Sequence, residues 1–269
     1  MSRVYSGIEF LRYYIRARNR YKLHSPLMYQ IATQVLDTKV NCPVFNQIES
    51  VRTELLTNQD PITQPLPGAG SKMQTKKLRI KDIVRWSSIP KYQGKWLFRL
   101  VRLFEPDRIL ELGTSFGLSS LYLHLARPEA RMVTVEGNQT VARIADSLTR
   151  NLRAPTLQFK VGSFAEQIPS CLNELGSVDL VFLDGDHQYE STLKYFEMIL
   201  PHMSKGGIFI LDDIYWSTEM KGAWNRLKDH PAVSSSVDLY YKGLLFFSEI
   251  HPGKVNKTLI PFWWKPFPF

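Results

Sequence analysis

The sequence predicts an α/β protein built on a doubly wound, mostly parallel sheet of seven strands, and three observations lead there. Short apolar runs typical of buried strands alternate five times with segments of helical periodicity between residues 108 and 227. Two last strand-like runs, 237–241 and 244–247, flank Lys242-Gly243, which favours an antiparallel C-terminal hairpin. Ahead of the sheet, residues 5–20 and 25–35 have amphipathic helical patterns, which predict an N-terminal helical cap.

The first β-α-β unit spans residues 108–136 and organises the rest. An apolar run at 109–112 predicts a strand, Gly113 and Gly117 punctuate the following turn, and leucines at helical spacing follow up to Pro128. The next strand, 132–135, ends at Glu136. The turn and Glu136 therefore share one edge of a parallel sheet, where ligands bind in open α/β folds.

The remaining elements follow in regular order. A helix over 88–104 leads into the sheet, and Pro106 closes it. Further strands are expected at 157–161, 178–183 and 207–211, with helices at 138–152, 164–172, 193–203 and 216–227.

The N-terminal part of the chain divides into two further segments. Residues 5–20 place Ile8, Leu11 and Ile15 on one stripe, and Ser25-Pro26 begins the second helix. Residues 57–79 are rich in Pro, Gly and polar side chains, which favours a loop or linker; a lid and simple disorder both explain that composition. The expected domains are a helical extension at 1–56, the loop at 57–79 and the main domain at 80–269.

Charge is unevenly distributed along the 269 residues. Residues 1–110 carry 19 Lys and Arg against 8 Asp and Glu, a net charge of +11, whereas the remainder carries 15 against 17, a net charge of −2. A basic N-terminal part suits an acidic substrate, nucleic acid or a membrane surface, but a basic solvent-facing surface is the simpler interpretation.

Several function classes are disfavoured by composition. No run of about 18 apolar residues predicts a membrane span, and no secretory signal is visible. Cys42 and Cys171 are the two cysteines, which disfavours a disulfide framework or a thiolate metal site and suits the cytoplasm. The oligomeric state stays open, a homodimer included.

The glycine turn indicates the ligand. A dinucleotide-binding turn needs G-x-G-x-x-G, and a P-loop needs a Lys, but residues 111–117 read E-x-G-x-x-x-G. A glycine turn in an unrelated α/β protein, with Glu136 as a solvated strand end, is the alternative. The pattern resembles motif I of class I S-adenosylmethionine (SAM) methyltransferases, which have a Rossmann-like sheet. The resemblance implies that Glu136 binds the ribose hydroxyls and that Ser163 and Phe164 lie at the adenine. It also implies a cofactor-binding set of Glu111, Gly113, Thr114, Ser115, Gly117, Glu136, Gly162, Ser163, Phe164 and Asp184.

A second group of polar residues follows two neighbouring strands. Asp184, Asp186 and His187 come after 178–183, and Asp212 and Asp213 come after 207–211. Carboxylates converging there would repel one another unless a cation or hydrogen bonds compensate, and Mg²⁺ prefers such oxygen ligands. Each Asp alone could instead be a helix N-cap.

The segment L-D-G-D-H-x-Y-E is similar to metal-dependent O-methyltransferases of the catechol and macrocin type. The resemblance implies that Asp184, Asp212 and Asp213 hold a metal and that His187, three residues after Asp184, is the general base. Asp213 stands where Asn is usual and His187 where Lys is usual, which leaves metal dependence and a phenolic substrate open. The resemblance covers residues 80–250, and L-H-S-P in residues 1–56 resembles the N-terminal extension of uncharacterised bacterial methyltransferases.

The function that these patterns favour is SAM-dependent O-methyl transfer to a small-molecule hydroxyl, with His187 and Asp184 as catalytic residues and with SAM and Mg²⁺ as cofactors. Two alternatives remain. One is an RNA or protein methyltransferase that binds through the basic N-terminal part, although no RNA-binding module and no Asn-Pro-Pro-Tyr motif is recognisable. The other is a non-catalytic SAM-binding protein.

Overall fold

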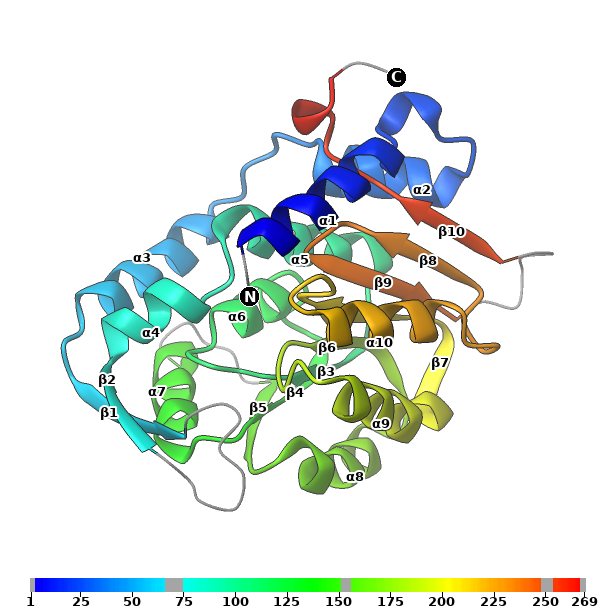
Figure 1. The fold of residues 1–269 in the computed structure, drawn as a ribbon. Coiled ribbons are helices and arrows are strands. Elements are labelled where there is room, and N and C mark those ends of the chain that lie inside the picture. The colour runs from blue at the N-terminus through cyan, green and yellow to red at the C-terminus, as the bar shows by residue number, and fades with distance from the viewer. Residues whose placement is uncertain (1–2, 66–74, 151–155, 248–253, 267–269) are drawn as a thin grey trace.

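The computed structural model describes residues 3–65, 75–150, 156–247 and 254–266 (Figure 1). Its centre is an eight-stranded sheet in the order β10-β8-β9-β7-β6-β3-β4-β5. The predicted fold class is confirmed, and the sheet has one strand more than expected. The strands are β3 (Arg108–Leu112), β4 (Arg131–Glu136), β5 (Leu157–Val161), β6 (Val178–Leu183), β7 (Met203–Asp212), β8 (Ser235–Asp238), β9 (Lys242–Phe246) and β10 (Val255–Thr258).

The direction in which the chain winds changes beside β3. Strands β3, β4 and β5 run parallel to one side, and β6 and β7 continue in parallel on the other side of β3. Only β9 is antiparallel to its neighbours β7 and β8, while the added strand β10 pairs in parallel with β8. The crevice at the carboxyl ends of β3 and β6 is therefore a topological switch point, the usual ligand site of such sheets.

Helices cover both faces of this sheet (Figure 1). Alternate strand residues belong to two separate apolar cores: Ile109 and Leu180 pack with α5, α6 and α7, and Leu110 and Val181 pack with α8, α9 and α10. This alternation follows from the two-residue period of a strand. The helices are α1 (Arg3–Arg16), α2 (Pro26–Gln30), α3 (Val44–Thr57), α4 (Ile80–Ser87), α5 (Lys91–Phe104), α6 (Leu118–His124), α7 (Gln139–Arg150), α8 (Phe164–Leu175), α9 (Tyr189–Ile199) and α10 (Thr218–Lys228), and α2 continues as a π-helix over Ile31–Leu36.

The apolar stripe of the first helix does not face the core. Ile8, Leu11 and Ile15 are exposed, and α1 instead buries Tyr13, whose hydroxyl donates to the Leu259 carbonyl at 2.5 Å. Helix α1 and the end of β10 accordingly lie side by side (Figure 1). Both faces of this helix carry apolar side chains, so periodicity alone could not decide which one packs.

The expectation of a loop over residues 57–79 is wrong for two stretches. Strands β1 (Pro61–Pro65) and β2 (Thr75–Arg79) form an antiparallel pair, and α4 follows at once. Residues 66–74 lie outside the described part. Ile62 is buried in the core, and Asn138 donates to the Thr63 carbonyl at 3.0 Å, which fixes β1 beside the end of β4.

The C-terminal hairpin exists, but its turn is not Lys242-Gly243. The turn comprises residues 239–241, with Tyr240 at a φ of 70°, and Lys242 begins β9. Asp238 stabilises this turn by accepting from the Tyr240 N–H at 2.9 Å. Gly243 is needed for packing, because a Cβ there would lie 2.5 Å from the Trp224 ring.

Two expectations about composition are also settled for the described residues. Cys42 and Cys171 are free thiols, as predicted. No helix in the described part of the chain combines the length and apolarity needed to cross a bilayer.

Candidate active site

A cavity of about 490 Å³ opens at the carboxyl ends of β3, β4, β6 and β7. The connection between α4 and α5 forms its other wall. Seven residues of the sequence-derived site line it, namely Gly113, Ser115, Glu136, Asp184, His187, Asp212 and Asp213. The remaining lining residues are Trp86, Ser87, Ser88, Ile89, Pro90, Gln93, Trp216 and Tyr241.

Gly113 allows β3 and β6 to approach each other at the floor of the cavity. Its φ is +109°, and a Cβ would lie 1.9 Å from the Asp184 carbonyl oxygen. The Asp184 N–H donates to the Leu112 carbonyl at 2.8 Å, so the two strand ends cannot separate without losing this bond. Glycine is required here for both backbone conformation and space.

We expect Gly113→Ala to lower the free energy of unfolding by roughly 2–5 kcal/mol, from backbone strain and a steric clash. Gly137→Ala is the matched control, because a Cβ there meets nothing within 4 Å. Denaturant unfolding of both variants measures the effect. Equal stability of the two variants would contradict this account of the turn.

Glu136 is held with its carboxylate at the cavity. Its Oε2 accepts from the Ser115 N–H and its Oε1 from the Asn138 N–H, each at 2.9 Å. Two backbone donors thus fix the carboxylate, and each oxygen keeps a further lone pair for a ligand.

Three predicted cofactor contacts lie beneath the cavity and do not line it. Glu111 is fully buried and accepts from the hydroxyls of Ser120 and Thr134, the latter at 2.7 Å. Thr114 is also fully buried and shares a hydrogen bond with Thr134, and Gly117, at a φ of 81°, precedes α6. These residues support the turn from below, so the structure does not place them at a ligand.

Burial raises the pKa of Glu111 to about 7, against hydrogen bonds that lower it. Because the folded pKa exceeds the unfolded one, this group's contribution to stability is present at low pH and lost as pH rises through 7. In the wild-type protein, this group should make the free energy of unfolding fall by roughly 3 kcal/mol between pH 5 and 8. We expect Glu111→Gln to lose this fall. Glu129→Gln, at an exposed residue, is the control. An unchanged pH dependence in Glu111→Gln would contradict the raised pKa.

The turn after β5 is built as a helix start. Ser163 caps α8 and forms a capping box with Glu166, and Gly162 has a φ of 147°. Phe164 packs against Tyr195 and lies so close to Gly185 that a Cβ there would be 2.9 Å from its ring. Neither of the two predicted adenine contacts, Ser163 and Phe164, lines the cavity described above, and Gly162 does not line it either, so their roles stay predictions.

The carboxylates at the ends of β6 and β7 form a buried cluster. Asp212 forms an ion pair with Lys242, Nζ to Oδ1 at 2.5 Å. Burial and the nearby Asp212 raise the pKa of Asp184 well above its ordinary value and that of Asp213 to about 7. Lys242 opposes both shifts. Ser217, and not Asp213, caps α10. The Asp186 carboxylate accepts a hydrogen bond from the Tyr195 hydroxyl at 2.7 Å.

His187 projects into the same cavity as Asp184. Its Nε2 lies 3.8 Å from Asp184 Oδ1, too far for a hydrogen bond. Burial lowers the pKa of His187 and outweighs the nearby carboxylates of Asp212 and Asp186, which raise it. The imidazole is therefore neutral at pH 7 and able to accept a proton. The first helical residue after it is Tyr189, and no side chain caps α9.

The predicted metal ligands are not arranged around an ion. Asp184, Asp212 and Asp213 share one cavity, but among the described residues no three His, Cys, Asp or Glu side chains are placed to hold one metal. Instead, a Lys ammonium already occupies one oxygen of Asp212. The carboxylate oxygens are of the type that Mg²⁺ prefers, but their arrangement here does not fit the ion.

Sequence reasoning missed several lining residues and Lys242. Trp86 and Trp216 flank the cavity with 85% and 52% of their surface exposed, and Trp216 lies over His187 with 6.3 Å between ring centroids. Trp86 lies in the last turn of α4, a helix that no sequence pattern predicted. The motif D-D-x-x-W was the available signal for Trp216, whereas no local pattern marks Lys242.

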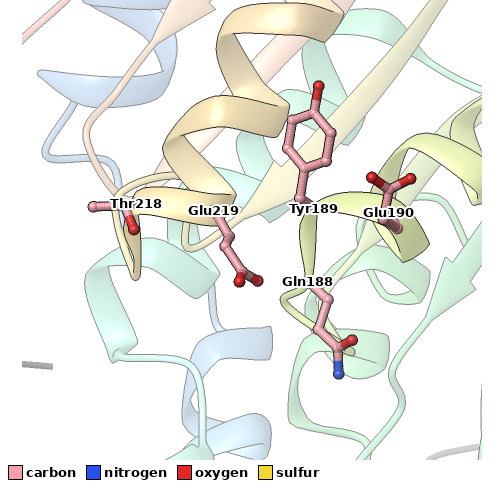
Figure 2. A pocket seen from close by; sticks show the side chains of 5 residues that line it. All are labelled: Gln188, Tyr189, Glu190, Thr218 and Glu219. Atoms are coloured by element: carbon pink, nitrogen blue, oxygen red, sulfur yellow. The ribbon is translucent and has the colours of Figure 1, made fainter.

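A second hollow, of about 480 Å³, lies between the N-terminal ends of α9 and α10 (Figure 2). Gln188, Tyr189, Glu190, Thr218 and Glu219 line it. Glu190 and Glu219 stand in the first turns of the two helices, where a carboxylate stabilises the helix dipole. The hollow thus needs no ligand to explain its charges, unlike the cavity that holds His187.

Comparison with known proteins agrees with this geometry. Residues 110–214, which contain the glycine turn, Glu136 and all the strand-end carboxylates, match a family described as a methyltransferase domain. This part of the chain is therefore similar to a methyltransferase domain. Two curated relatives are the catechol O-methyltransferases of Mycobacterium tuberculosis, 31% identical over 45% of this chain, and of Niastella koreensis, 28% identical over 47%. The matched segments span 54% and 58% of those relatives' own length.

Solved structures share the fold of this chain. An O-methyltransferase of Streptomyces achromogenes in complex with SAM superposes with a TM-score of 0.55 at 20% identity, covering 82% of this chain and 95% of that one. An O-methyltransferase of Bacillus cereus in complex with SAH superposes with a TM-score of 0.53 at 20% identity, covering 77% and 91%.

Proposed function

We infer that the chain is a SAM-dependent O-methyltransferase that acts on a small-molecule hydroxyl. The observation that carries this is a single cavity in which the Glu136 carboxylate and the Gly113 turn face His187. A fixed carboxylate suits a ribose diol, because it accepts from two hydroxyls at once. A neutral imidazole suits removal of a hydroxyl proton near neutral pH.

The residues fit SAM, since Gly113 and Glu136 line one cavity and each Glu136 oxygen keeps a lone pair for a ligand. When bound, SAM supplies an electrophilic methyl group. Glu136 would hold the ribose, His187 would take the acceptor's proton at its free nitrogen, and Asp184 would orient the acceptor oxygen. Holding donor and acceptor in line supplies much of the rate acceleration.

The walls favour an acceptor with an apolar body. Trp86 and Trp216 expose indole surface at the cavity, and Tyr241 and Ile89 line it as well. Pockets for small molecules combine such apolar walls with a few polar groups. The polar groups here are those at the strand ends, so the acceptor's hydroxyl would point toward His187.

A transfer assay tests the proposal. The protein is incubated with methyl-labelled SAM and, separately, with a small-metabolite extract, an RNA fraction and a protein fraction. We expect label in an ether or ester of the small-molecule fraction. Label in RNA or protein would contradict the acceptor class, and SAM binding without transfer to any fraction would contradict the enzymatic function.

A further inference from the structure

The acidic cluster of the cavity already contains a cation from the chain itself. We propose that Lys242 takes the structural place of a divalent metal beside Asp212, so that this methyltransferase works without a metal ion. The proposal rests on the proposed function, but its central measurement needs no turnover. Lys242 is fully buried, and its Nζ donates to Asp212 Oδ1 at 2.5 Å.

Strand pairing fixes this ion pair. Lys242 begins β9 and stands directly opposite Asp212, the last residue of β7, in the antiparallel register. Directly paired residues lie about 4.5–5.5 Å apart, so the ammonium reaches the carboxylate from the neighbouring strand. The Phe182 ring, 5.2 Å from Nζ, closes the site from the adjacent strand β6. Three neighbouring strands therefore hold the amine in place. A metal ion could displace it only at a large cost in free energy.

The charge of the cluster explains why a cation is needed there. Asp184, Asp212 and Asp213 all line one cavity, and buried like charges destabilise one another. The metal of a metal-dependent enzyme would compensate such a cluster. Here the Lys242 ammonium does so from behind Asp212, since Lys242 itself does not line the cavity.

A divalent ion would fit poorly beside this amine. It would lie close to the Lys242 ammonium, and two cations at such a distance repel each other strongly in a buried site. Mg²⁺ also demands nearly ideal octahedral geometry, and the described residues contain no group of three ligands arranged for a metal. Lys242 is thus a positioning residue: it holds Asp212 and does not touch the acceptor.

A Mn²⁺-binding experiment on the full chain, monitored by electron paramagnetic resonance, tests the proposal directly. We expect no bound Mn²⁺ at the cluster in the wild-type protein. Lys242→Met removes the ammonium with little change of volume and frees Asp212, so this variant should bind Mn²⁺ at least about tenfold more tightly than wild type. Lys194→Met, the same change at an exposed residue of α9, should leave Mn²⁺ binding as in wild type.

Thermal unfolding of the same proteins provides the second readout. Lys242→Met leaves a buried carboxylate unpaired, so its melting temperature should fall, and Mn²⁺ should restore part of the loss by binding the folded state. The double variant Lys242→Met with Asp212→Asn removes both charges and should lose the Mn²⁺ response. Lys242→Arg keeps a cation and should remain without bound Mn²⁺.

Turnover in EDTA completes the test. We expect wild-type activity to be unchanged by chelation and Lys242→Met activity to become sensitive to it. Wild-type protein that binds one Mn²⁺ through Asp212, with binding lost in Asp212→Asn, would overturn the proposal even if no acceptor were known. So would a folded Lys242→Met variant that binds no Mn²⁺. Failure of every fraction to accept a methyl group would instead count against the proposed function alone.

Discussion

Replacing His187 by alanine is expected to lower kcat by roughly 10²–10⁴-fold while SAM affinity is retained, because the general base is lost and the cofactor contacts are not. Burial lowers the pKa of His187, so the base is neutral over most of the physiological range. In the wild-type protein, log kcat should therefore rise with pH through a pKa below 6.5 and level off above it. The variant should lose this rise.

Two further variants make the His187 measurement specific. The pKa of Asp213 is raised to about 7, so Asp213→Asn shows whether that carboxyl contributes to the same pH profile. His24→Ala changes an exposed residue far from His187 in the sequence and controls for the loss of an imidazole. Measuring kcat and melting temperature on one preparation decides the role. An unchanged kcat with a lowered melting temperature in His187→Ala would end the general-base assignment.

Local sequence patterns were sufficient for the features that depend on neighbours along the chain. Strand periodicity and the turn at Gly113 predicted the β-α-β unit, and the positions of Asp184 and His187 after one strand predicted that both would reach the same cavity. The side-chain alternation of a strand also explains where Glu111 lies. It shares a sheet face with Ile109 and accepts a hydrogen bond from Ser120 of α6, and its contact with a cofactor stays a prediction.

Features that depend on long-range pairing could not be predicted in this way. Lys242 precedes a glycine and therefore has the local pattern of a hairpin turn, but the register between β7 and β9 places it against Asp212. Nothing near Lys242 in the sequence reveals that partner. The first helix is similar: it has apolar side chains on both faces, and only the Leu259 carbonyl on a distant segment selects Tyr13 for burial. For the same reason, local sequence could not reveal that β9 supplies a cation beside Asp212, one of the predicted metal ligands.

The second large effect is expected at Glu136. Glu136→Ala removes two hydrogen bonds from ribose hydroxyls to a charged acceptor, each worth roughly 1.5–3 kcal/mol, so SAM affinity should fall by about 10²–10⁴-fold. The same change also releases the N–H groups of Ser115 and Asn138, which could loosen the turn by itself. Glu136→Gln separates the two causes. The glutamine amide keeps the shape of the side chain but turns an NH₂ group toward one of those donors. The Glu136→Gln variant should therefore also bind SAM weakly. Its melting temperature should stay closer to wild type than that of the alanine variant.

Asp186→Ala is the matched control for Glu136. Asp186 also follows a strand at this edge of the sheet, but its carboxylate accepts from the Tyr195 hydroxyl and does not line the cavity. We expect its SAM affinity to stay within about threefold of wild type, the range of an indirect effect below 1 kcal/mol. Isothermal titration calorimetry with SAM and with its demethylated product measures all three variants. Wild-type affinity in Glu136→Ala would remove this carboxylate from the cofactor site, and equal losses in Glu136→Ala and Asp186→Ala would show that the strand ends act through stability and not through contact with the ribose.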